Sequence, residues 1–260
     1  DAPSGGSELG ERALLVTDQS TGETYLVWRG HRHLLHEPAL VIPALFGEMV
    51  TATVAGTAWL NALPAGADIG PIHVPDRGSS SAAVPDREIG ELLVAETASG
   101  PQYYLVVADG LAPMTELQKD IYVAQYSVDP VPVSISEATA APTSALFPPQ
   151  PEEIQAPPAA PALASPGGND LLCAVTADAA AIPSVWVGGA VAHLADALPT
   201  GSVTPDGVSL TDQVLVPSGH VAVVRVVGAP GGDTGAYYLV TDAGRRYAVP
   251  SPEVLLILGY

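Results

Sequence analysis

The sequence repeats one short pattern three times, at 24–47, 103–124 and 237–260. Each copy has an apolar run with the letters YLV, then a turn with glycine, and ends in a segment with helical spacing. A hairpin with one short helix buries too little apolar surface to be stable alone. We therefore expect the copies to pack on one another or on a shared sheet, as structural repeats do.

A glycine stands at the expected hairpin turn of each copy, where the backbone needs a positive φ. We interpret these glycines as structural residues of the repeat: Gly30, Gly110 and Gly244. In the last copy Ser251 has the position of a helix cap, with Pro252 in the first turn and Glu253 near the positive end of the helix dipole. Each unit is thus predicted to be a hairpin followed by a short helix.

Three further strand candidates lie between the copies, at 90–96, 170–176 and 220–227. They are apolar, contain β-branched residues, and are bounded by turn residues. Because they come from distant parts of the chain, we expect them to form a common central sheet. The predicted fold class is α+β and mostly β, an elongated set of hairpin-plus-short-helix repeats packed around that central sheet. The residues leave open whether 184–198 is a degenerate fourth copy.

These patterns predict an order of segments along the chain. A flexible segment at 1–12 precedes a repeat unit at 13–48, a connecting segment at 49–89, a central-sheet strand with a repeat unit at 90–126, a Pro/Ala-rich linker or strap at 127–169, a central-sheet strand with the degenerate repeat at 170–200, and central-sheet strands with the final repeat at 201–260. The strap is too rich in proline for a core of its own, so we expect only short regular pieces there. Proteases should cut first within 156–169.

Charge excludes several kinds of partner. The chain has 28 acidic and 9 basic residues, a formal net charge of −19. Nucleic-acid binding needs a basic footprint, and an anionic membrane surface repels such a chain. The longest uncharged run, at 49–67, is interrupted by polar residues, proline and glycine, so no transmembrane segment and no signal peptide are predicted within the chain.

The residues also give little support to catalysis or metal binding. A phosphate-binding loop needs lysine after its glycines, and the one lysine, Lys119, follows Gln118 in an expected helix. No G-x-S-x-G motif is present. The cluster His31, His33 and His36 has a spacing that zinc ligands use, but we interpret it as a solvated hairpin. We predict no catalytic, cofactor-binding or metal-binding residue and no cofactor.

Three motifs together resemble a known family. They are the closing YLVTDAGRRYAVPSPEVLLILGY, the opening ALLVTDQSTGETYLVWRG, and WLNALPAG at 59–66. They resemble EccB, a membrane component of the type VII (ESX) secretion apparatus of actinobacteria. The resemblance covers almost the whole chain and is most specific in the closing motif. It implies a single-pass protein of the cell inner membrane, with repeats of this type in its extracytoplasmic (periplasmic) region.

The resemblance also implies partners and roles. Partners would be other ESX membrane components, including the EccC-type motor ATPase, and other copies of the protein. Membrane attachment would come from an anchor helix that this chain lacks. Compared with the family, the chain also lacks the first repeat and a closing proline-rich tail. The chain thus resembles a truncated extracytoplasmic fragment. Some family members are described as ATPases, although no residue here carries a nucleotide-binding motif.

One cysteine is present, Cys173, so no internal disulfide can form. Its apolar surroundings alone favour a small buried side chain. The family has two cysteines in this region. The resemblance therefore implies that Cys173 bonds, in a longer protein, to a cysteine upstream of the ALLVTD strand, and that the thiol in this chain is unpaired and largely buried.

The function that these observations favour is an extracytoplasmic scaffold subunit of an ESX secretion complex, acting through protein–protein contacts. A cell-wall (peptidoglycan) binding module is the alternative, because the family's repeats are similar to a phage-lysin subunit that binds cell wall. The chain has only three tryptophans for a carbohydrate surface, namely Trp28, Trp59 and Trp186. Retention on purified peptidoglycan distinguishes the two. A weak ATPase or hydrolase is a third reading, which nucleotide calorimetry tests.

Overall fold

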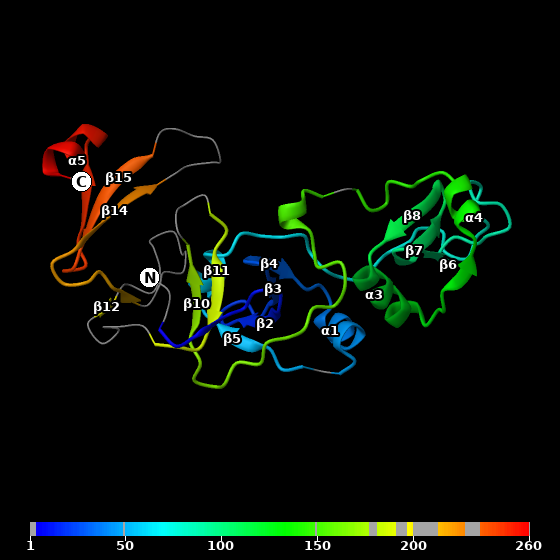
Figure 1. The fold of residues 1–260 in the computed structure, drawn as a ribbon, viewed down its shortest axis with the longest axis horizontal. Helices are drawn as coiled ribbons and strands as arrows, with labels where there is room; N and C mark the ends of the chain where they lie inside the picture. The colour runs from blue at the N-terminus through cyan, green and yellow to red at the C-terminus, as the bar shows by residue number, and fades with distance from the viewer. Residues whose placement is uncertain are drawn as a thin grey trace. The chain divides into compact units, whose positions relative to one another are not determined.

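A computed structural model describes residues 4–48, 50–148, 150–176, 181–190, 197–199, 213–226 and 235–259. The fold is α+β and mostly β, with short helices between strands (Figure 1). The chain divides into two compact units. One is Gly6–Gly188, and the other is Gly189–Tyr260 together with Pro3–Gly5.

The first repeat is a four-stranded sheet with one helix. Its elements are β2 (Ala13–Asp18), β3 (Thr24–Trp28), β4 (His31–Leu34), α1 (Pro38–Phe46) and β5 (Thr53–Ala55). The strand order is β4-β3-β2-β5, and β5 returns beside β2 in parallel. The helix α2 (Thr57–Asn61) follows this sheet.

Both faces of this sheet are buried. Successive side chains along each strand point to opposite faces, and each face packs in its own apolar cluster. Leu14 and Val16 of β2 join one apolar cluster, while Ala13 and Leu15 join another that also contains α1. The helix α1 begins with proline in its first turn and ends at Gly47, which has a φ of +74°. The left-handed glycine lets the last turn close on the carbonyl of Pro43.

The second repeat has the same plan. Its elements are β6 (Leu92–Thr97), β7 (Gly100–Val107), β8 (Gly110–Met114), α3 (Glu116–Tyr126) and β9 (Val131–Val133). The strand order is β8-β7-β6-β9, with β9 parallel to β6. Thr115 and Gln118 cap α3 reciprocally, each side chain bonding the other residue's backbone N–H.

The helices of these two repeats pack on each other, and Figure 1 shows α1 and α3 side by side. Val41 and Leu45 of α1 share one apolar cluster with Leu117 and Ile121 of α3. Burying each such side chain stabilises the fold by about 1.5–3 kcal/mol, so the shared cluster fastens the two repeats together.

The expected common central sheet is wrong. The first candidate strand is β6, which pairs with β7 inside the second repeat. The second is β10 (Leu172–Val175), which pairs with β11 (Ser184–Val187), and β11 pairs with β1 (Ser7–Glu8). The third is β14 (Val221–Val226), which belongs to the third repeat. Each strand pairs with a neighbour in sequence because a short loop costs less entropy to close than a long one.

The final repeat lies in the second unit. Here β14, β15 (Ala236–Thr241) and β16 (Arg246–Val249) form an antiparallel sheet in that order, and α5 (Pro252–Leu258) follows. The short strands β12 (Leu198–Pro199) and β13 (Gln213–Val214) pair with each other. Ser251 is at the N-cap position of α5, with Pro252 and Glu253 in the first turn as predicted, although the Ser251 side chain makes no cap hydrogen bond.

The Pro/Ala-rich segment runs along the first unit as an extended chain with short regular pieces. These are β9, α4 (Ile135–Ala140) and a 3₁₀ turn at Glu152–Ile154. Its carbonyl at Ala162 accepts a hydrogen bond from the Ala13 N–H, and Ser144 N–H donates to the Leu111 carbonyl. Residues 141–164 of this strap bond to both repeats. The end of 184–198, the stretch left open as a degenerate fourth copy, includes residues 191–196, which lie outside the described residues.

Candidate functional site

The three turn glycines all have positive φ, at +74° for Gly30, +151° for Gly110 and +66° for Gly244. Space is also tight around two of them. A Cβ on Gly30 would lie 2.2 Å from the Pro183 carbonyl oxygen, and one on Gly110 would lie 2.1 Å from that of Pro142. At Gly244 the nearest atom is the flexible end of Leu198, at 2.8 Å. These glycines are needed for the backbone conformation of the turns, and glycine has no side chain that could act on a substrate.

Cys173 lies on β10 opposite Trp186 and is a free thiol. It is partly buried, on a strand at the edge of the sheet β1-β11-β10. The expected burial of this thiol stays a prediction. Burial still raises the pKa of the Cys173 thiol, which keeps it mostly protonated near neutral pH.

The histidines of the first hairpin are placed differently from the expectation of a solvated hairpin. His31 and His33 are buried, and only His36 is exposed. The segment 64–69 lies alongside β4 and covers the inward-facing side chains. His33 Nδ1 lies 2.8 Å from the Ala67 carbonyl oxygen, and His36 Nε2 lies 2.9 Å from Asp68 Oδ2. In the described ranges no three His, Cys, Asp or Glu side chains are grouped as metal ligands.

His33 is fully buried, and its Nε2 has no hydrogen-bond partner within the described structure. Burial lowers the pKa of His33, because a charged imidazole would lose its solvation there. Gly66 is essential to this arrangement, since a Cβ on that residue would lie 2.2 Å from His33 Cε1. His33 is therefore a structural, neutral side chain.

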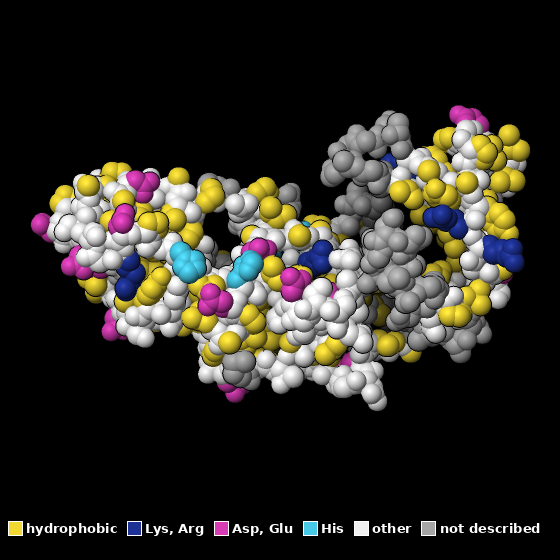
Figure 2. All heavy atoms as spheres, turned by 180° about the vertical axis from the view of Figure 1, so that it is seen from behind, with side chains coloured by type: hydrophobic (Ala, Val, Ile, Leu, Met, Phe, Trp, Pro, Cys, Tyr) yellow, Lys and Arg dark blue, Asp and Glu magenta, His cyan; other side chains and the backbone are white. Residues whose placement is uncertain are grey.

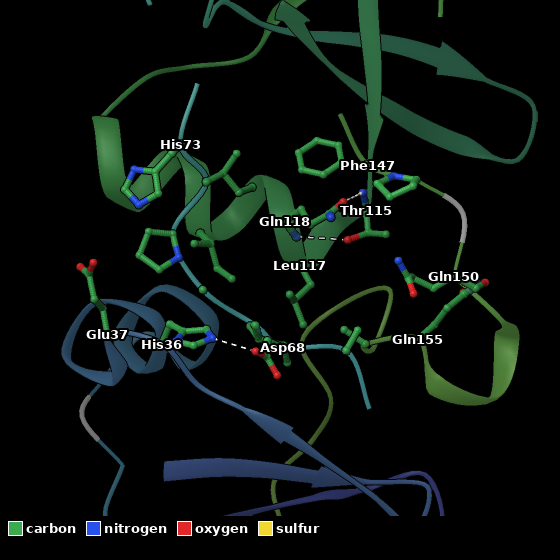
Figure 3. A pocket seen from close by; sticks show the side chains of 18 of the residues that line it. His36, Glu37, Asp68, His73, Thr115, Leu117, Gln118, Phe147, Gln150 and Gln155 are labelled. Carbon is green, nitrogen blue, oxygen red and sulfur yellow. Dashed lines mark hydrogen bonds and ion pairs between the residues drawn. The ribbon is translucent and has the colours of Figure 1, made fainter. Parts of the chain in front are cut away.

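A cavity of about 800 Å³ opens between the two repeats of the first unit (Figure 3). The starts of α1 and α3 contribute to its walls, and so do the segments 67–73 and 147–156. Sequence reasoning missed this cavity because its lining comes from four separate stretches of chain.

The second unit exposes apolar side chains on its helix. Leu256 and Ile257 of α5 are 75% and 83% exposed, and Val223 and Val226 of β14 are also exposed. On the face shown in Figure 2, hydrophobic and uncharged groups make up most of the described surface, and Lys and Arg side chains are few. This agrees with the acidic composition, which gives no basic footprint for nucleic acid.

Across the described part of the chain, no helix has the length and apolar character needed to cross a membrane.

Two solved structures have the same fold. An EccB3 dimer from the ESX-3 core complex matches with a TM-score of 0.70 at 23% identity, over 100% of this chain and 68% of that one. A chain of an intact ESX-5 inner membrane complex matches with a TM-score of 0.67 at 21% identity, over 97% of this chain and 54% of that one.

Two curated proteins of Mycobacterium tuberculosis are similar in sequence. The ESX-1 secretion system ATPase EccB1 is 36% identical over 107 residues, which are 38% of this chain and 21% of that protein. The ESX-2 secretion system ATPase EccB2 is 30% identical over 115 residues, 43% of this chain and 23% of that protein. The match thus spans less than a quarter of either relative.

The family model described as "Type VII secretion system ESX-1, transport TM domain B" matches residues 3–260. The chain belongs to this family, the EccB components of type VII secretion systems.

Proposed function

We propose that this chain is an extracytoplasmic, periplasmic part of an EccB-type membrane component and serves as an assembly scaffold of an ESX secretion complex. The observation that carries the proposal is the family match over residues 3–260. The fold shared with a chain of an ESX-5 inner membrane complex supports it. In this role the chain acts by binding other proteins and not by chemical turnover.

The architecture suits such a role. Each of the first two repeats has its own sheet, and their helices are fastened by a shared apolar cluster. A rigid body of this kind holds binding surfaces at fixed spacing. The exposed apolar side chains of α5 and β14 add surface that protein contacts commonly use.

The proposed partners are other ESX membrane components, including an EccC-type ATPase, and further copies of the protein. An anchor helix outside this chain would attach it to the inner membrane. One similar solved structure is an EccB3 dimer, and another is the periplasmic assembly of the ESX-5 inner membrane complex. Those assemblies support the proposal by similarity of fold.

The test compares two versions of the tagged full-length protein in its own host. One contains residues 13–260 of this chain, and the other lacks them but keeps the membrane anchor. After mild detergent extraction, the complete protein should co-purify with the other membrane components in one large complex. The shortened protein should not. Equal recovery of the complex with both versions would show that this region is not a scaffold.

A second candidate function, ATP hydrolysis, is favoured by the names of the two curated relatives. It is tested by calorimetric titration of this chain with Mg-ATP. We expect no saturable binding, because the chain has a net charge of −19 and no phosphate-binding lysine motif. A site with a Kd of about 1 μM would instead revive the ATPase function.

A further inference from the structure

The cavity between the two repeats has the size of a ligand-binding pocket. Its volume is about 800 Å³, within the range of pockets that hold small molecules or short peptide segments. His36 and Glu37 enter from the start of α1, and Thr115 and Gln118 from the start of α3 (Figure 3). The whole cavity lies within the first compact unit.

The lining of the cavity is mixed, with a somewhat larger apolar share. Four buried aliphatic side chains and several rings contribute to the lining. They are Ile69, Ile72, Leu117, Ile121, Phe147 and the prolines Pro71, Pro113 and Pro148. An apolar lining with flat rings favours ligands that carry compact apolar groups, and proline rings are such groups.

The rim of the cavity carries primary amides. Gln118 Oε1 accepts a hydrogen bond from the Thr115 N–H at 2.9 Å, so the Gln118 amide is held in place while its NH₂ group remains a donor. Gln155 Nε2 donates to the Gln150 carbonyl at 2.7 Å, and its oxygen can accept a second bond. Such amides suit the carbonyl and N–H groups of an extended peptide backbone.

The strap is an extended, proline-rich chain that already binds beside the cavity. The Pro158 carbonyl accepts a hydrogen bond from the Leu117 N–H at 3.0 Å, and the Ile154 carbonyl accepts one from the Ala67 N–H at 2.7 Å. Leu117 and Ala67 both line the cavity. The cavity is therefore continuous with a surface that holds an extended, proline-rich chain by its carbonyls.

Charge narrows the ligand further. The ionisable groups that line the cavity are His36, Glu37, Asp68 and His73, and His36 is paired with Asp68. No lysine or arginine is among the lining residues, and the chain as a whole is acidic. An acidic peptide would be repelled, so charge excludes ligands with a net negative charge.

We propose that this cavity binds an extended, uncharged, proline-rich segment of a partner polypeptide. Proline rings pack on the apolar lining, and backbone carbonyls accept hydrogen bonds from the amide of Gln118. The inference rests on the proposed scaffold role for its class of ligand, a polypeptide. It is tested on this chain alone, so its failure leaves the assembly test of the whole complex unaffected.

The experiment uses NMR titration of the isotope-labelled 260-residue chain with the synthetic peptide QAPPAAPALAS, a copy of residues 155–165. Backbone amides of Ile69, Gly70 and Gln118 should shift and saturate, with a Kd below about 1 mM. A second peptide with every proline replaced by alanine should bind at least about fivefold more weakly, since it lacks the preformed extended backbone. Equal binding of the two peptides, or no saturable shift, overturns the proposal.

Two variants locate the site. Phe147→Ala and Gln155→Ala should each weaken peptide binding about fivefold or more, through loss of an apolar wall or an amide partner. Gln102→Ala is the matched control, because Gln102 is an exposed glutamine on β7 that does not line the cavity. Spectra of the unbound variants establish that the fold is kept. A saturable shift at Ala13, which bonds Ala162 and Ala164 of the strap and lies outside the cavity lining, would mean that the peptide exchanges with the strap and would also overturn the proposal.

Discussion

The first two repeats and the third have the same hairpin and helix but differ in what covers the helix. In the first unit α1 and α3 cover each other, and Ile121 is only 1% exposed. In the second unit α5 buries Leu255 within its own repeat and leaves Leu256 75% exposed. The same local pattern thus gives the same local fold, while the core depends on whether a second helix is supplied.

The largest expected effect is at the shared cluster. Ile121→Ala should lower the free energy of unfolding of the first unit by about 2–5 kcal/mol, because it leaves a cavity between α1 and α3. Leu256→Ala, on the exposed face of α5, should change stability by no more than about 0.5 kcal/mol. All three tryptophans lie in the first unit, so urea unfolding followed by tryptophan fluorescence measures the Ile121 variant, and amide hydrogen exchange in β15 and β16 of the second unit measures the Leu256 variant. Comparable losses for the two variants would remove the distinction between the repeats.

The turn glycines extend the same comparison. Gly110→Ala should destabilise the first unit by about 2–3 kcal/mol, because the backbone conformation is nearly restricted to glycine and the Pro142 carbonyl blocks a Cβ. Gly244→Val should cost about 1 kcal/mol or more, since only its φ resists the change and Leu198 can move. Fluorescence measures the first, and amide hydrogen exchange in β15 and β16 measures the second. An unaffected Gly110→Ala protein would refute the steric argument.

A pH effect near neutral pH is expected from His33, in the first unit. The pKa of His33 is lowered by burial, so below about pH 6.5 the unfolded chain binds a proton that the folded chain resists. The free energy of unfolding should therefore fall as the pH drops below about 6.5, by at most about 1.4 kcal/mol per pH unit. Replacing His33 with Gln should flatten this slope, and replacing the exposed His36 with Gln should not. The measurement is urea unfolding at a series of pH values. If the free energy of unfolding of the His33→Gln protein depends on pH as steeply as before, another group causes the effect.

The smallest expected effect is at Cys173, on an edge strand outside the repeats. Its raised pKa and half-burial predict slower reaction with a disulfide reagent at pH 8 than in the urea-unfolded chain, by severalfold. We also propose that a longer protein with the upstream cysteine has this thiol oxidised. Thiol titration before and after reduction measures both. A native thiol that reacts as fast as the unfolded one contradicts the first prediction.

The sequence predicted those parts of the fold that depend on neighbouring residues. The hairpins and helices follow from glycine turns and apolar spacing, which act over a few residues. The pairing of β6, β10 and β14 was predicted wrongly, because apolar strands carry no label for their partners. Adjacency in sequence would have been the better guide, since it minimises the entropy of loop closure.

The buried histidines show a second limit. His31 and His33 are two apart and flank Arg32, so strand alternation alone indicated one shared face. What the sequence did not indicate is that segment 64–69 covers that face, with Gly66 leaving room for the His33 ring. The cavity was missed for the same reason, because its walls meet only after both repeats have packed.

The strap has a consequence for how the sheets of the first unit end. An open strand edge offers unpaired N–H and carbonyl groups to any other extended chain, and this invites aggregation. In the second repeat the backbone of Leu111, on the outer strand β8, bonds to Pro142 and Ser144 of the strap. In the first, β5 pairs with β2 only from Val16 to Asp18, and Ala13 of β2 bonds to Ala162 and Ala164 of the strap. The strap thus occupies backbone groups of Leu111 and Ala13 that would otherwise be open, so neighbouring molecules cannot add a strand at these two places.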